Sequence, residues 1–524
     1  MTTTAKKVCV FLADTLFKRG VRRVVVSPGS RNTPLIVAFS RHPGLEVFSV
    51  VDERSAAFIG LGMARASARP VAVCCTSGTA GLNFGPAVAE AYYSSVPLIV
   101  ITADRPAGLV ARRAPQTIVQ PSIYAGFIKS CVDIACEDGS DAFIRDAVSR
   151  MDSAVAMAAE GVRGPVHINV QLAAPLGQLA EFEPCDLDVV ADAPYAVPSE
   201  FDKSKYAGRT FIFVGAGANV SKNILRQASE LPGVVVFAEC YTGFAQTGDS
   251  IISNVGPALA AGLQRSGAPR PQRVIKVGNS LLSKTYYDRF DSEAICVNDD
   301  ASLAALLPYG YAGGEYFKTY WSECSRKAYS DALRLAANAP WSQLKATDAV
   351  VSRCARCNVQ ISNGMSIRYA QIFDWRRAES VGCNRGVSGI DGSVSTAIGF
   401  AAVSERPTVL ITGDMSFQYD MGALATNFIP DDFVIIVMNN RGGGIFRYID
   451  TTRHLDELEP LISGPVNLPV EGLARAFGFG YRRADSVTRL LEALSDARAS
   501  KMIIEVVTDT VTDCKVLNNY YNTI

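Results

Sequence analysis

The sequence has no long hydrophobic run and no excess of charge of either sign. Its longest apolar runs, VPLIVI at 96–101 and FVIIVM at 433–438, are much shorter than the roughly 20 residues that a helix needs to cross a bilayer. The 51 Lys and Arg balance the 51 Asp and Glu, so no overall field draws the chain to nucleic acid or to an anionic membrane. We therefore expect neither membrane insertion nor nucleic-acid binding.

The features of a secreted protein are also missing. The N-terminal stretch has two lysines and a short apolar segment broken by Asp14 and Lys18, which is typical of an amphipathic helix and not of a signal peptide. The 13 cysteines are odd in number, and most lie in apolar runs, which indicates reduced core residues. Examples are Cys74, Cys75, Cys240 and Cys296. Cys354 and Cys357 have metal-ligand spacing but lack the partners of a zinc site. We expect a cytoplasmic protein.

The order of apolar segments predicts an α/β chain with three doubly wound parallel sheets. The 524 residues are enough for two to four domains. Short β-branched runs alternate with helical spacing, which favours βαβ units. We expect domains at 1–180, 205–330 and 348–524, separated by an acidic linker at 178–207 and a polar helical region at 313–348. Predicted strands include VRRVVV, PVAVCC, PLIVITAD, PVHINV, TFIFV, GVVVFA, RVIKV, AICV, PTVLIT, FVIIVM and KMIIEVV.

Gly215 and Gly217 form a GxG turn after a predicted strand. The dinucleotide-binding fingerprint requires a third glycine, and Val220 stands in its place. We therefore interpret 215–217 as an ordinary turn from a strand into a helix.

Two oxygen-bearing side chains follow predicted strands in the third block. Asp414 and Asn440 each stand at the carboxyl end of a strand, and in an open parallel sheet those ends face the crevice where ligands bind. A carboxylate, an amide oxygen and a backbone carbonyl, here that of Gly442, are ligands that Mg²⁺ accepts. The glycines at 442–444 allow close approach of a diphosphate. Each residue alone is typical of a cap or turn, but the pairing favours a metal site.

The GD motif followed by NN resembles the magnesium and diphosphate motif of thiamine-diphosphate enzymes. In these enzymes the three blocks are a pyrimidine-binding, a central and a diphosphate-binding domain. The resemblance implies thiamine diphosphate and Mg²⁺ or Mn²⁺ as cofactors, with Glu53 of VVDERSAAF as the catalytic glutamate. A carboxyl group on the aminopyrimidine ring favours the tautomer that removes the C2 proton of the cofactor. Without the later motif, Glu53 would be explained equally well as a first-turn helix carboxylate.

Several motifs in matching order are similar to one family within this group. They are SPGSRNTPL, DERSAAFIGLG, TSGTAGLNFGPAVAEAYYSSVPLIVITADRP, NRGVSGIDG and GDMSFQYDMGAL. The family is 2-succinyl-5-enolpyruvyl-6-hydroxy-3-cyclohexene-1-carboxylate synthase of menaquinone biosynthesis. The resemblance implies a transferase in which 2-oxoglutarate loses CO₂ and its succinyl carbanion equivalent adds 1,4 to isochorismate. It also implies a homodimer or homotetramer whose active sites lie at a subunit interface.

The resemblance extends to individual site residues. It implies substrate contacts from Ser30, Arg31, Arg105, Gln116, Lys284, Arg368, Arg385, Ile445 and Phe446. It implies cofactor contacts from Glu53, Ile390, Asp414, Met415, Ser416, Asn440, Gly442 and Gly443, with the metal on Asp414, Asn440 and Gly442. Both substrates carry two carboxylates, which arginine forks bind bidentately. Gly364 and Thr285 depart from the family, which commonly has serine and a basic residue there; Ser366 is the candidate replacement for the serine.

Two alternatives stay open at this point. One is another thiamine-diphosphate enzyme, similar to acetolactate synthase or a decarboxylase, with a different acceptor. The other is a non-catalytic protein that kept the scaffold. The arginines favour dicarboxylate substrates over small apolar 2-oxo acids. The presence of Glu53, Asp414 and Asn440 favours an enzyme over a non-catalytic protein. The three histidines lie outside the strongest motifs, so we do not expect histidine acid/base catalysis.

Overall fold

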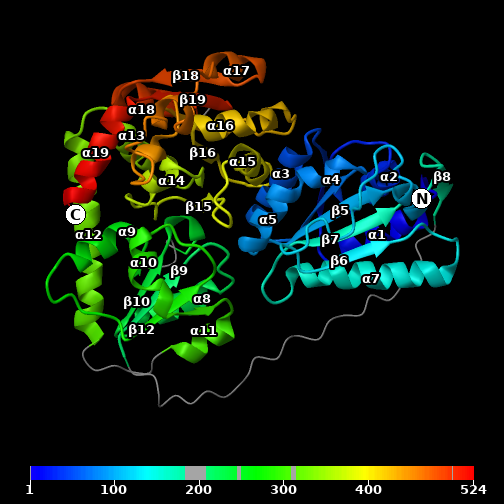
Figure 1. Ribbon diagram of the computed structural model, residues 1–524, viewed down its shortest axis with the longest axis horizontal. Coiled ribbons are helices and arrows are strands. Elements are labelled where there is room, and N and C mark those ends of the chain that lie inside the picture. Colours follow the sequence, from blue (N-terminus) through cyan, green and yellow to red (C-terminus); the bar gives the residue numbers. More distant parts are fainter. Residues whose placement is uncertain (1, 183–207, 245–249, 308–313, 498–499, 524) are drawn as a thin grey trace. The chain divides into compact units, whose positions relative to one another are not determined.

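The computed structural model describes residues 2–182, 208–244, 250–307, 314–497 and 500–523 (Figure 1). The chain forms two compact units. Unit 1 contains the residues up to 196 together with 398–403 and 426–428, and unit 2 contains the rest. Among the helices of the described ranges, none combines the length and the apolar character needed to cross a membrane.

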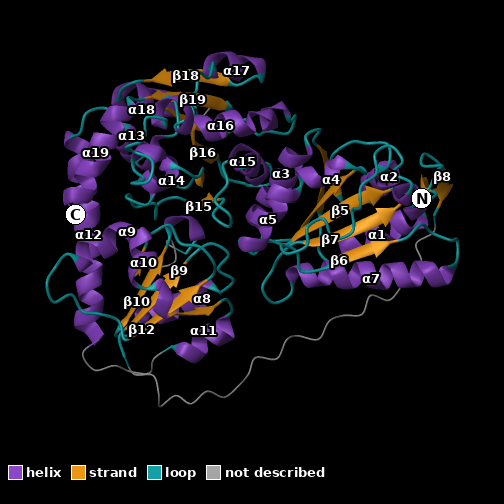
Figure 2. Cartoon of the chain, viewed as in Figure 1, coloured by secondary structure: helices purple, strands orange, loops and turns teal. Residues whose placement is uncertain are grey.

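Unit 1 is built on a six-stranded parallel sheet in the order β3-β2-β4-β5-β7-β6 (Figure 2). Its strands are β2 (Arg23–Val26), β3 (Glu46–Ser49), β4 (Val71–Cys75), β5 (Leu98–Asp104), β6 (Cys131–Ile134) and β7 (Val166–Gln171). A separate antiparallel pair joins β1 (Thr2–Thr4) to β8 (Leu179–Glu181). The helices are α1 (Lys7–Lys18), α2 (Thr33–Arg41), α3 (Glu53–Ser67), α4 (Thr79–Asn83), α5 (Gly85–Tyr93), α6 (Ala107–Ala111) and α7 (Asp141–Ala159). Side chains of α1, α2 and α7 pack together with alternate strand residues into one core.

Unit 2 contains two parallel sheets, the first of which has five strands in the order β11-β10-β9-β12-β13. These strands are β9 (Thr210–Val214), β10 (Val234–Ala238), β11 (Ile251–Ile252), β12 (Arg273–Val277) and β13 (Ala294–Val297). The helices are α8 (Lys222–Glu230), α9 (Val255–Leu263), α10 (Lys284–Arg289), α11 (Asp300–Leu306) and α12 (Gly314–Asn338). The glycine turn at 215–217 connects β9 to α8. A Cβ atom on Gly215 would lie 2.4 Å from the Ser280 carbonyl oxygen, so close backbone packing accounts for this glycine.

The second sheet of unit 2 has six strands in the order β15-β14-β16-β17-β19-β18. They are β14 (Asn358–Ile361), β15 (Ser380–Cys383), β16 (Thr408–Gly413), β17 (Phe433–Asn439), β18 (Gly480–Ala484) and β19 (Met502–Val507). The helices are α13 (Gln343–Val351), α14 (Met365–Ala370), α15 (Ser393–Ala401), α16 (Asp414–Asp420), α17 (Val470–Ala476), α18 (Val487–Asp496) and α19 (Thr510–Thr523). Taken in chain order, this sheet repeats the strand order of unit 1. The last four residues of α15 belong to unit 1. In both six-stranded sheets the strand order reverses beside the first strand, which is between β2 and β4 in unit 1 and between β14 and β16 in unit 2.

The predicted α/β class with parallel sheets is confirmed, and so are the predicted interior strands. The predicted strands did not include β6, β11, β15 and β18, which lie at sheet edges and are shorter or less apolar than the buried runs. They also did not include β14, an interior strand of four residues. The predicted limits at 330 and 348 fall inside α12 and α13. Most of the predicted linker at 178–207 lies outside the described residues. Cys74, Cys75 and Cys240 are buried as expected, but the prediction was wrong for Cys296, which is exposed on the edge strand β13.

The two sheets of unit 2 meet around a buried carboxylate. Glu239 follows β10, is completely buried, and accepts the backbone N–H groups of Leu282 and Ser283 at 2.8 and 3.2 Å. Its other oxygen has no hydrogen-bond partner among the residues that the structure describes. The hydroxyl of Ser280 donates to the backbone carbonyl of Arg385, which follows β15. Burial raises the pKa of the Glu239 carboxyl to about 7, while the N–H of Leu282 and the charge of Arg385 oppose that shift.

Replacing this carboxyl with an amide should change how stability depends on pH. An unfolded glutamate loses its proton near pH ~4.3, whereas folded Glu239 keeps it up to a pH of about 7. The native protein therefore loses stability as pH rises through this window, by on the order of 3 kcal/mol for this group. Glu239→Gln still accepts both N–H bonds but does not titrate. We expect urea unfolding to give the wild type and Glu239→Gln similar free energies of unfolding at pH 5, and the variant a higher one at pH 8. The same difference in free energy of unfolding at both pH values would contradict this prediction.

Candidate active site

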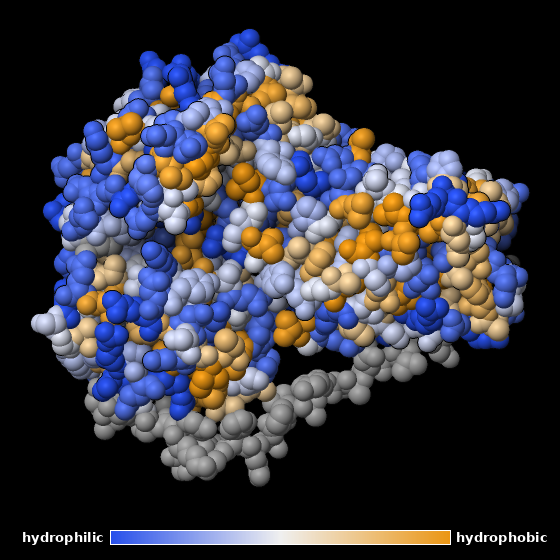
Figure 3. Space-filling view, viewed as in Figure 1, coloured by the Kyte–Doolittle hydropathy of each residue, from blue (hydrophilic) through white to orange (hydrophobic). Residues whose placement is uncertain are grey.

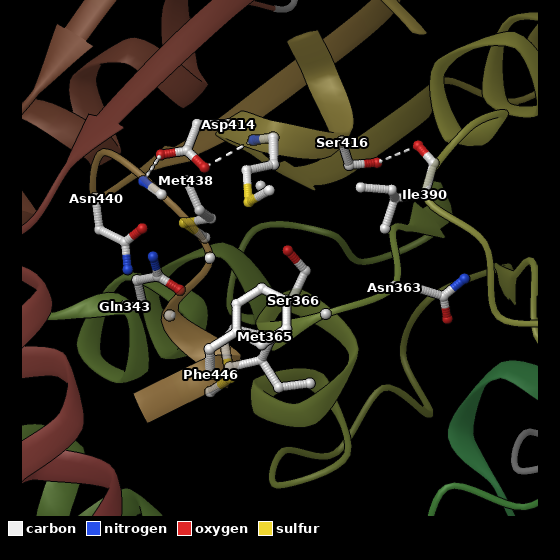
Figure 4. A pocket seen from close by; sticks show the side chains of 17 residues that line it. Gln343, Asn363, Met365, Ser366, Ile390, Asp414, Ser416, Met438, Asn440 and Phe446 are labelled. Atoms are coloured by element: carbon white, nitrogen blue, oxygen red, sulfur yellow. Dashed lines mark hydrogen bonds between the residues drawn. The ribbon is translucent and has the colours of Figure 1, made fainter. Parts of the chain in front are cut away.

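A pocket with a cavity volume of about 130 Å³ lies at the carboxyl ends of β14, β16 and β17 in unit 2. In Figure 4 the Asp414 carboxylate lies at the top of the pocket, and the amides of Asn440 and Gln343 lie together at one side. Ile390 and Ser416 are on the opposite side, with Phe446 below. The pocket therefore gathers residues from several turns at the edge of the sheet where the strand order reverses.

Asp414 joins the turns that follow β16 and β17. Its carboxylate oxygens accept the backbone N–H groups of Met415 at 2.7 Å and of Gly442 at 2.9 Å, and the residue is only 2% exposed. Burial raises the pKa of this carboxyl to about 6, and backbone N–H groups, led by that of Gly442, oppose the shift. The three predicted metal ligands, Asp414, Asn440 and Gly442, are thus brought to one wall of the pocket.

The glycine turn after Asn440 leaves no room for side chains. Gly442 has a φ of +147°, and a Cβ atom there would lie 2.9 Å from the Ser463 carbonyl oxygen. A Cβ atom on Gly443 would lie 2.7 Å from the Phe446 ring, and one on Gly444 3.1 Å from the Asn440 amide nitrogen. The turn thus exposes backbone to the pocket, as close approach of a diphosphate requires.

The donor set fits a hard cation held jointly with an anionic ligand. One carboxylate, one amide and one backbone carbonyl are oxygen donors of the kind that Mg²⁺ and Mn²⁺ accept. In the described part of the chain, no group of three His, Cys, Asp or Glu side chains could hold a metal ion by itself. Oxygens of a bound diphosphate and water would therefore complete the coordination sphere.

The other predicted cofactor contacts in unit 2 also line this pocket. The Ser416 hydroxyl donates to the Ile390 carbonyl at 3.1 Å, which ties α16 to the loop that carries Ile390. The Met415 side chain lies beside Gly443, because a Cβ atom there would be 3.0 Å from the Met415 sulfur. Ile445 and Phe446, which were predicted as substrate contacts, line the same pocket. Lining residues that were not named from the sequence are Gln343, Asn363, Met365 and Met438.

Two predicted substrate arginines lie near each other in unit 2. Arg385 is 8% exposed, donates to the Asn363 side chain at 3.0 Å, and has its guanidinium carbon 6.0 Å from the centre of the Tyr241 ring. Arg368 donates to the Gly364 carbonyl at 2.7 Å. Burial and then the charge of Arg385 lower the pKa of Arg368. Such a pair of neighbouring guanidinium groups attracts anions.

The remaining predicted contacts of unit 2 differ in their surroundings. Lys284 is exposed at the first residue of α10, directly after the segment that Glu239 holds. Gly364 has a φ of +88° and lies at the start of α14, so a serine there would be strained. Ser366, the predicted replacement, is buried and lines the pocket.

Glu53 is the first residue of α3 in unit 1 and is half-buried. Asp52 caps this helix by accepting the Arg54 backbone N–H at 3.0 Å, so Glu53 itself is not needed as the cap. Within the described ranges, no hydrogen bond involves the Glu53 carboxylate. Glu53 lies in the first turn of α3, so the explanation that the sequence left open, a carboxylate favoured by the helix dipole, also fits its position.

A second pair of arginines lies at the reversal of strand order in unit 1. The Arg31 backbone N–H donates to the Thr76 hydroxyl at 3.3 Å, across the gap between β2 and β4. Burial and then the charge of Arg105 lower the pKa of Arg31, so these two side chains are neighbours. Arg105 also donates to the Gln116 side chain at 3.4 Å. Ser30, exposed in the same turn as Arg31, completes the predicted set.

A buried glutamine that sequence reasoning missed supports this region. Gln120 is completely buried, accepts the Gly78 backbone N–H at 2.8 Å and donates to the Ala103 carbonyl at 3.1 Å. It thereby joins the turn after β4 to the end of β5. A polar residue in a loop gives no sequence signal for this role, because its partners lie elsewhere in the chain.

Comparisons with known proteins agree with this geometry. The N-terminal TPP binding domain of thiamine pyrophosphate enzymes matches residues 6–123, and the C-terminal TPP binding domain of these enzymes matches residues 363–506. The chain is 34% identical to a 2-succinyl-5-enolpyruvyl-6-hydroxy-3-cyclohexene-1-carboxylate synthase of Porphyromonas gingivalis, over 98% of this chain and 97% of that protein. It is 32% identical to the synthase of the same name from Flavobacterium psychrophilum, over 96% of each chain. A third synthase of this name, from Bacteroides thetaiotaomicron, is 28% identical over 99% of this chain and 98% of its own length. The chain therefore belongs to the 2-succinyl-5-enolpyruvyl-6-hydroxy-3-cyclohexene-1-carboxylate synthase family of thiamine pyrophosphate enzymes, and it is an enzyme of the transferase class.

Proposed function

We propose that this enzyme decarboxylates 2-oxoglutarate and adds the resulting succinyl carbanion equivalent 1,4 to isochorismate, as a step of menaquinone biosynthesis in the cytoplasm. The observation that carries the proposal is the wall formed by Asp414, Asn440 and Gly442, together with two arginines of the same unit. Arg385 is buried and donates to Asn363, which lines the pocket, and Arg368 is half-buried. The wall supports a metal-bound diphosphate, and the arginines support anionic substrates.

The residues of unit 2 would hold the cofactor by its diphosphate end. Asp414, Asn440 and the Gly442 carbonyl would bind Mg²⁺ or Mn²⁺, while the turn at Gly443 approaches the diphosphate and Ile390 supports the rings. Bound thiamine diphosphate would supply the carbon centre that stabilises the negative charge left by decarboxylation. Glu53 would hold a proton at the pyrimidine nitrogen, because a carboxyl group is the side chain suited to that exchange.

The cationic residues would select substrates with two carboxylates. Arg31 and Arg105 with Gln116 form one group, and Arg368 and Arg385 form another, with Lys284 as an additional exposed cation. A guanidinium fork binds a carboxylate with two parallel hydrogen bonds, so each pair offers more charge than a small monocarboxylate needs. This favours 2-oxoglutarate and isochorismate over pyruvate.

Exposed apolar side chains near Glu53 support a homodimer or homotetramer. Val51, two residues before Glu53, is 79% exposed, and Leu82 on α4 is 51% exposed. On the face of unit 1 visible in Figure 3, a group of apolar side chains lies over the region of α4. Contact with another subunit would remove this surface from water. In the proposed assembly, Glu53 of one subunit meets the metal site of another.

The direct test is to combine the protein with thiamine diphosphate, Mg²⁺, 2-oxoglutarate and isochorismate. We expect isochorismate to be consumed only when all components are present. Consumption is measured by ultraviolet absorbance, and the product is identified by its mass. Pyruvate should not replace 2-oxoglutarate, because it lacks the second carboxylate. Equal turnover with pyruvate would favour a different carboligase of the same superfamily.

Glu53→Gln should separate catalysis from cofactor binding. The amide keeps the size of the side chain but does not exchange a proton, so we expect turnover to fall by at least about 100-fold. Binding of thiamine diphosphate with Mg²⁺, measured by calorimetry, should stay within a few-fold of the wild type. Glu46→Gln, at an exposed carboxylate of the same unit, is the matched control and should keep full turnover. Full turnover in Glu53→Gln would overturn the assigned role.

Arg385→Lys should weaken substrate use while keeping the charge. Lysine lacks the planar fork, and a hydrogen bond to a charged group contributes about 1.5–3 kcal/mol. We therefore expect kcat/KM to fall by roughly 10- to 100-fold for the substrate that this residue contacts. Arg226→Lys, on the exposed face of α8, is the control. If Arg385→Lys matches that control with both substrates, Arg385 does not bind a substrate carboxylate.

A further inference from the structure

A second acidic residue lies directly behind the predicted metal ligand Asn440. Asp513 is in the first turn of α19, at the end of the chain, and is 3% exposed. Its carboxylate accepts the Gln343 backbone N–H at 2.7 Å and the Thr508 hydroxyl at 2.8 Å. The same oxygen that accepts Thr508 also faces the Asn440 side-chain nitrogen at 3.4 Å. Three donors from three segments therefore converge on one carboxylate.

This contact determines which end of the Asn440 amide faces the pocket. An ionised carboxylate only accepts hydrogen bonds, so it faces the NH₂ group of the amide and not its oxygen. The carbonyl oxygen of Asn440 is then turned away from Asp513. The NH₂ end has room because residue 444 is glycine, where a Cβ atom would lie 3.1 Å from that nitrogen. A metal ion requires the opposite end, the oxygen.

The neighbouring asparagine of the NN motif is held in the same manner by a different acid. The Asn439 side-chain nitrogen donates to Glu505 at 2.6 Å, and its oxygen accepts the Arg441 backbone N–H at 3.2 Å. Both amides of the motif are thus oriented by carboxylates from the C-terminal segment, on β19 and α19. Asn439 directs its oxygen to the backbone N–H of Arg441, within the turn.

We propose that Asp513 is a positioning residue that fixes the Asn440 amide with its oxygen toward the metal ion. The inference rests on the proposed function, since it concerns the metal site named there. Asp513 is not among the residues that line the pocket, so we infer that it acts indirectly, by excluding the flipped amide. Partners of this kind behind a metal ligand typically change metal affinity by about 10- to 100-fold.

Asp513→Asn removes this restriction. The new side chain offers one acceptor oxygen for three donors, so if that oxygen serves the Gln343 N–H, an NH₂ group faces Asn440 and favours the flipped amide. We expect the affinity for Mg²⁺, at fixed thiamine diphosphate, to fall by about 10- to 100-fold. The measurement is a metal titration of the full-length protein followed by intrinsic fluorescence, with free Mn²⁺ measured by electron paramagnetic resonance as a second probe.

A matched control is Asp509→Asn. Asp509 lies one turn earlier and accepts the backbone N–H and hydroxyl of Thr512, both at 2.8 Å, so its replacement makes the same chemical change without touching Asn440. It should bind Mg²⁺ like the wild type. Equal losses in Asp509→Asn and Asp513→Asn would show that α19 is merely disturbed and would overturn the proposal.

Exchanging the two side chains gives a rescue test. In the double variant Asn440→Asp with Asp513→Asn, the new amide at position 513 donates to one oxygen of the new carboxylate at position 440. The other oxygen of that carboxylate remains for the metal. The double variant should bind Mg²⁺ more tightly than Asn440→Asp alone, where two acids face each other. This comparison also serves if Asp513→Asn alone does not fold. The proposal would be overturned if the losses of Mg²⁺ affinity in the two single variants add up in the double variant, or if Asp513→Asn has the affinity of the wild type. A wild-type protein that binds no Mg²⁺ in the presence of thiamine diphosphate would instead contradict the proposed function.

Discussion

Parallel strands whose order reverses within a sheet are the constraint on which this structure depends. Where the order reverses, the connections leave the two adjacent strands in opposite directions, and a crevice opens at their carboxyl ends. Unit 1 and the second sheet of unit 2 share one strand order, and both reverse beside their first strand. A hydrogen bond crosses the gap in each: Arg31 to Thr76 in unit 1, and Gly413 to Ser362 in unit 2, where the N–H to hydroxyl distance is 3.2 Å. Several candidate site residues lie at these gaps, among them Arg31 in unit 1 and Asp414 in unit 2.

The first sheet of unit 2 has a different strand order and a different part in the site. It carries Lys284, and its buried Glu239 holds the segment that precedes that lysine. The same region contacts Arg385 through Ser280 and the Tyr241 ring. A buried, partly unpartnered carboxylate costs stability, because burial disfavours its charge. The carboxylate holds the backbone segment that precedes Lys284 and lies close to Arg385. The proposed preference for dicarboxylate substrates depends on where these two cationic residues are placed.

The sequence motifs of the predicted metal site contain its ligands but not the residues that orient those ligands. Asp414 and Asn440 are visible in the sequence because each follows a buried apolar strand, and strand ends of a parallel sheet share one edge. The orientation of the Asn440 amide involves Asp513, which is 73 residues away in the sequence and belongs to a helix with no motif of its own. Gln120 in unit 1 is similar, since its partner Gly78 is 42 residues away. Polar groups of this kind have partners that only folding brings near.

The sequence by itself determined the fold class, most of the interior strands, the family and the residues at the strand ends, because buried parallel strands require apolar runs and close backbone turns require glycine. It did not reveal the edge strands β6, β11, β15 and β18, since an edge strand has one partner and needs less apolar surface. It also misassigned Cys296, because an apolar run at a sheet edge is only partly covered. Tertiary structure alone decided the burial of Glu239, the pairing of Arg368 with Arg385 and the contact of Asp513 with Asn440. These depend on distances between segments that are remote in the chain, and local patterning carries no information about such distances.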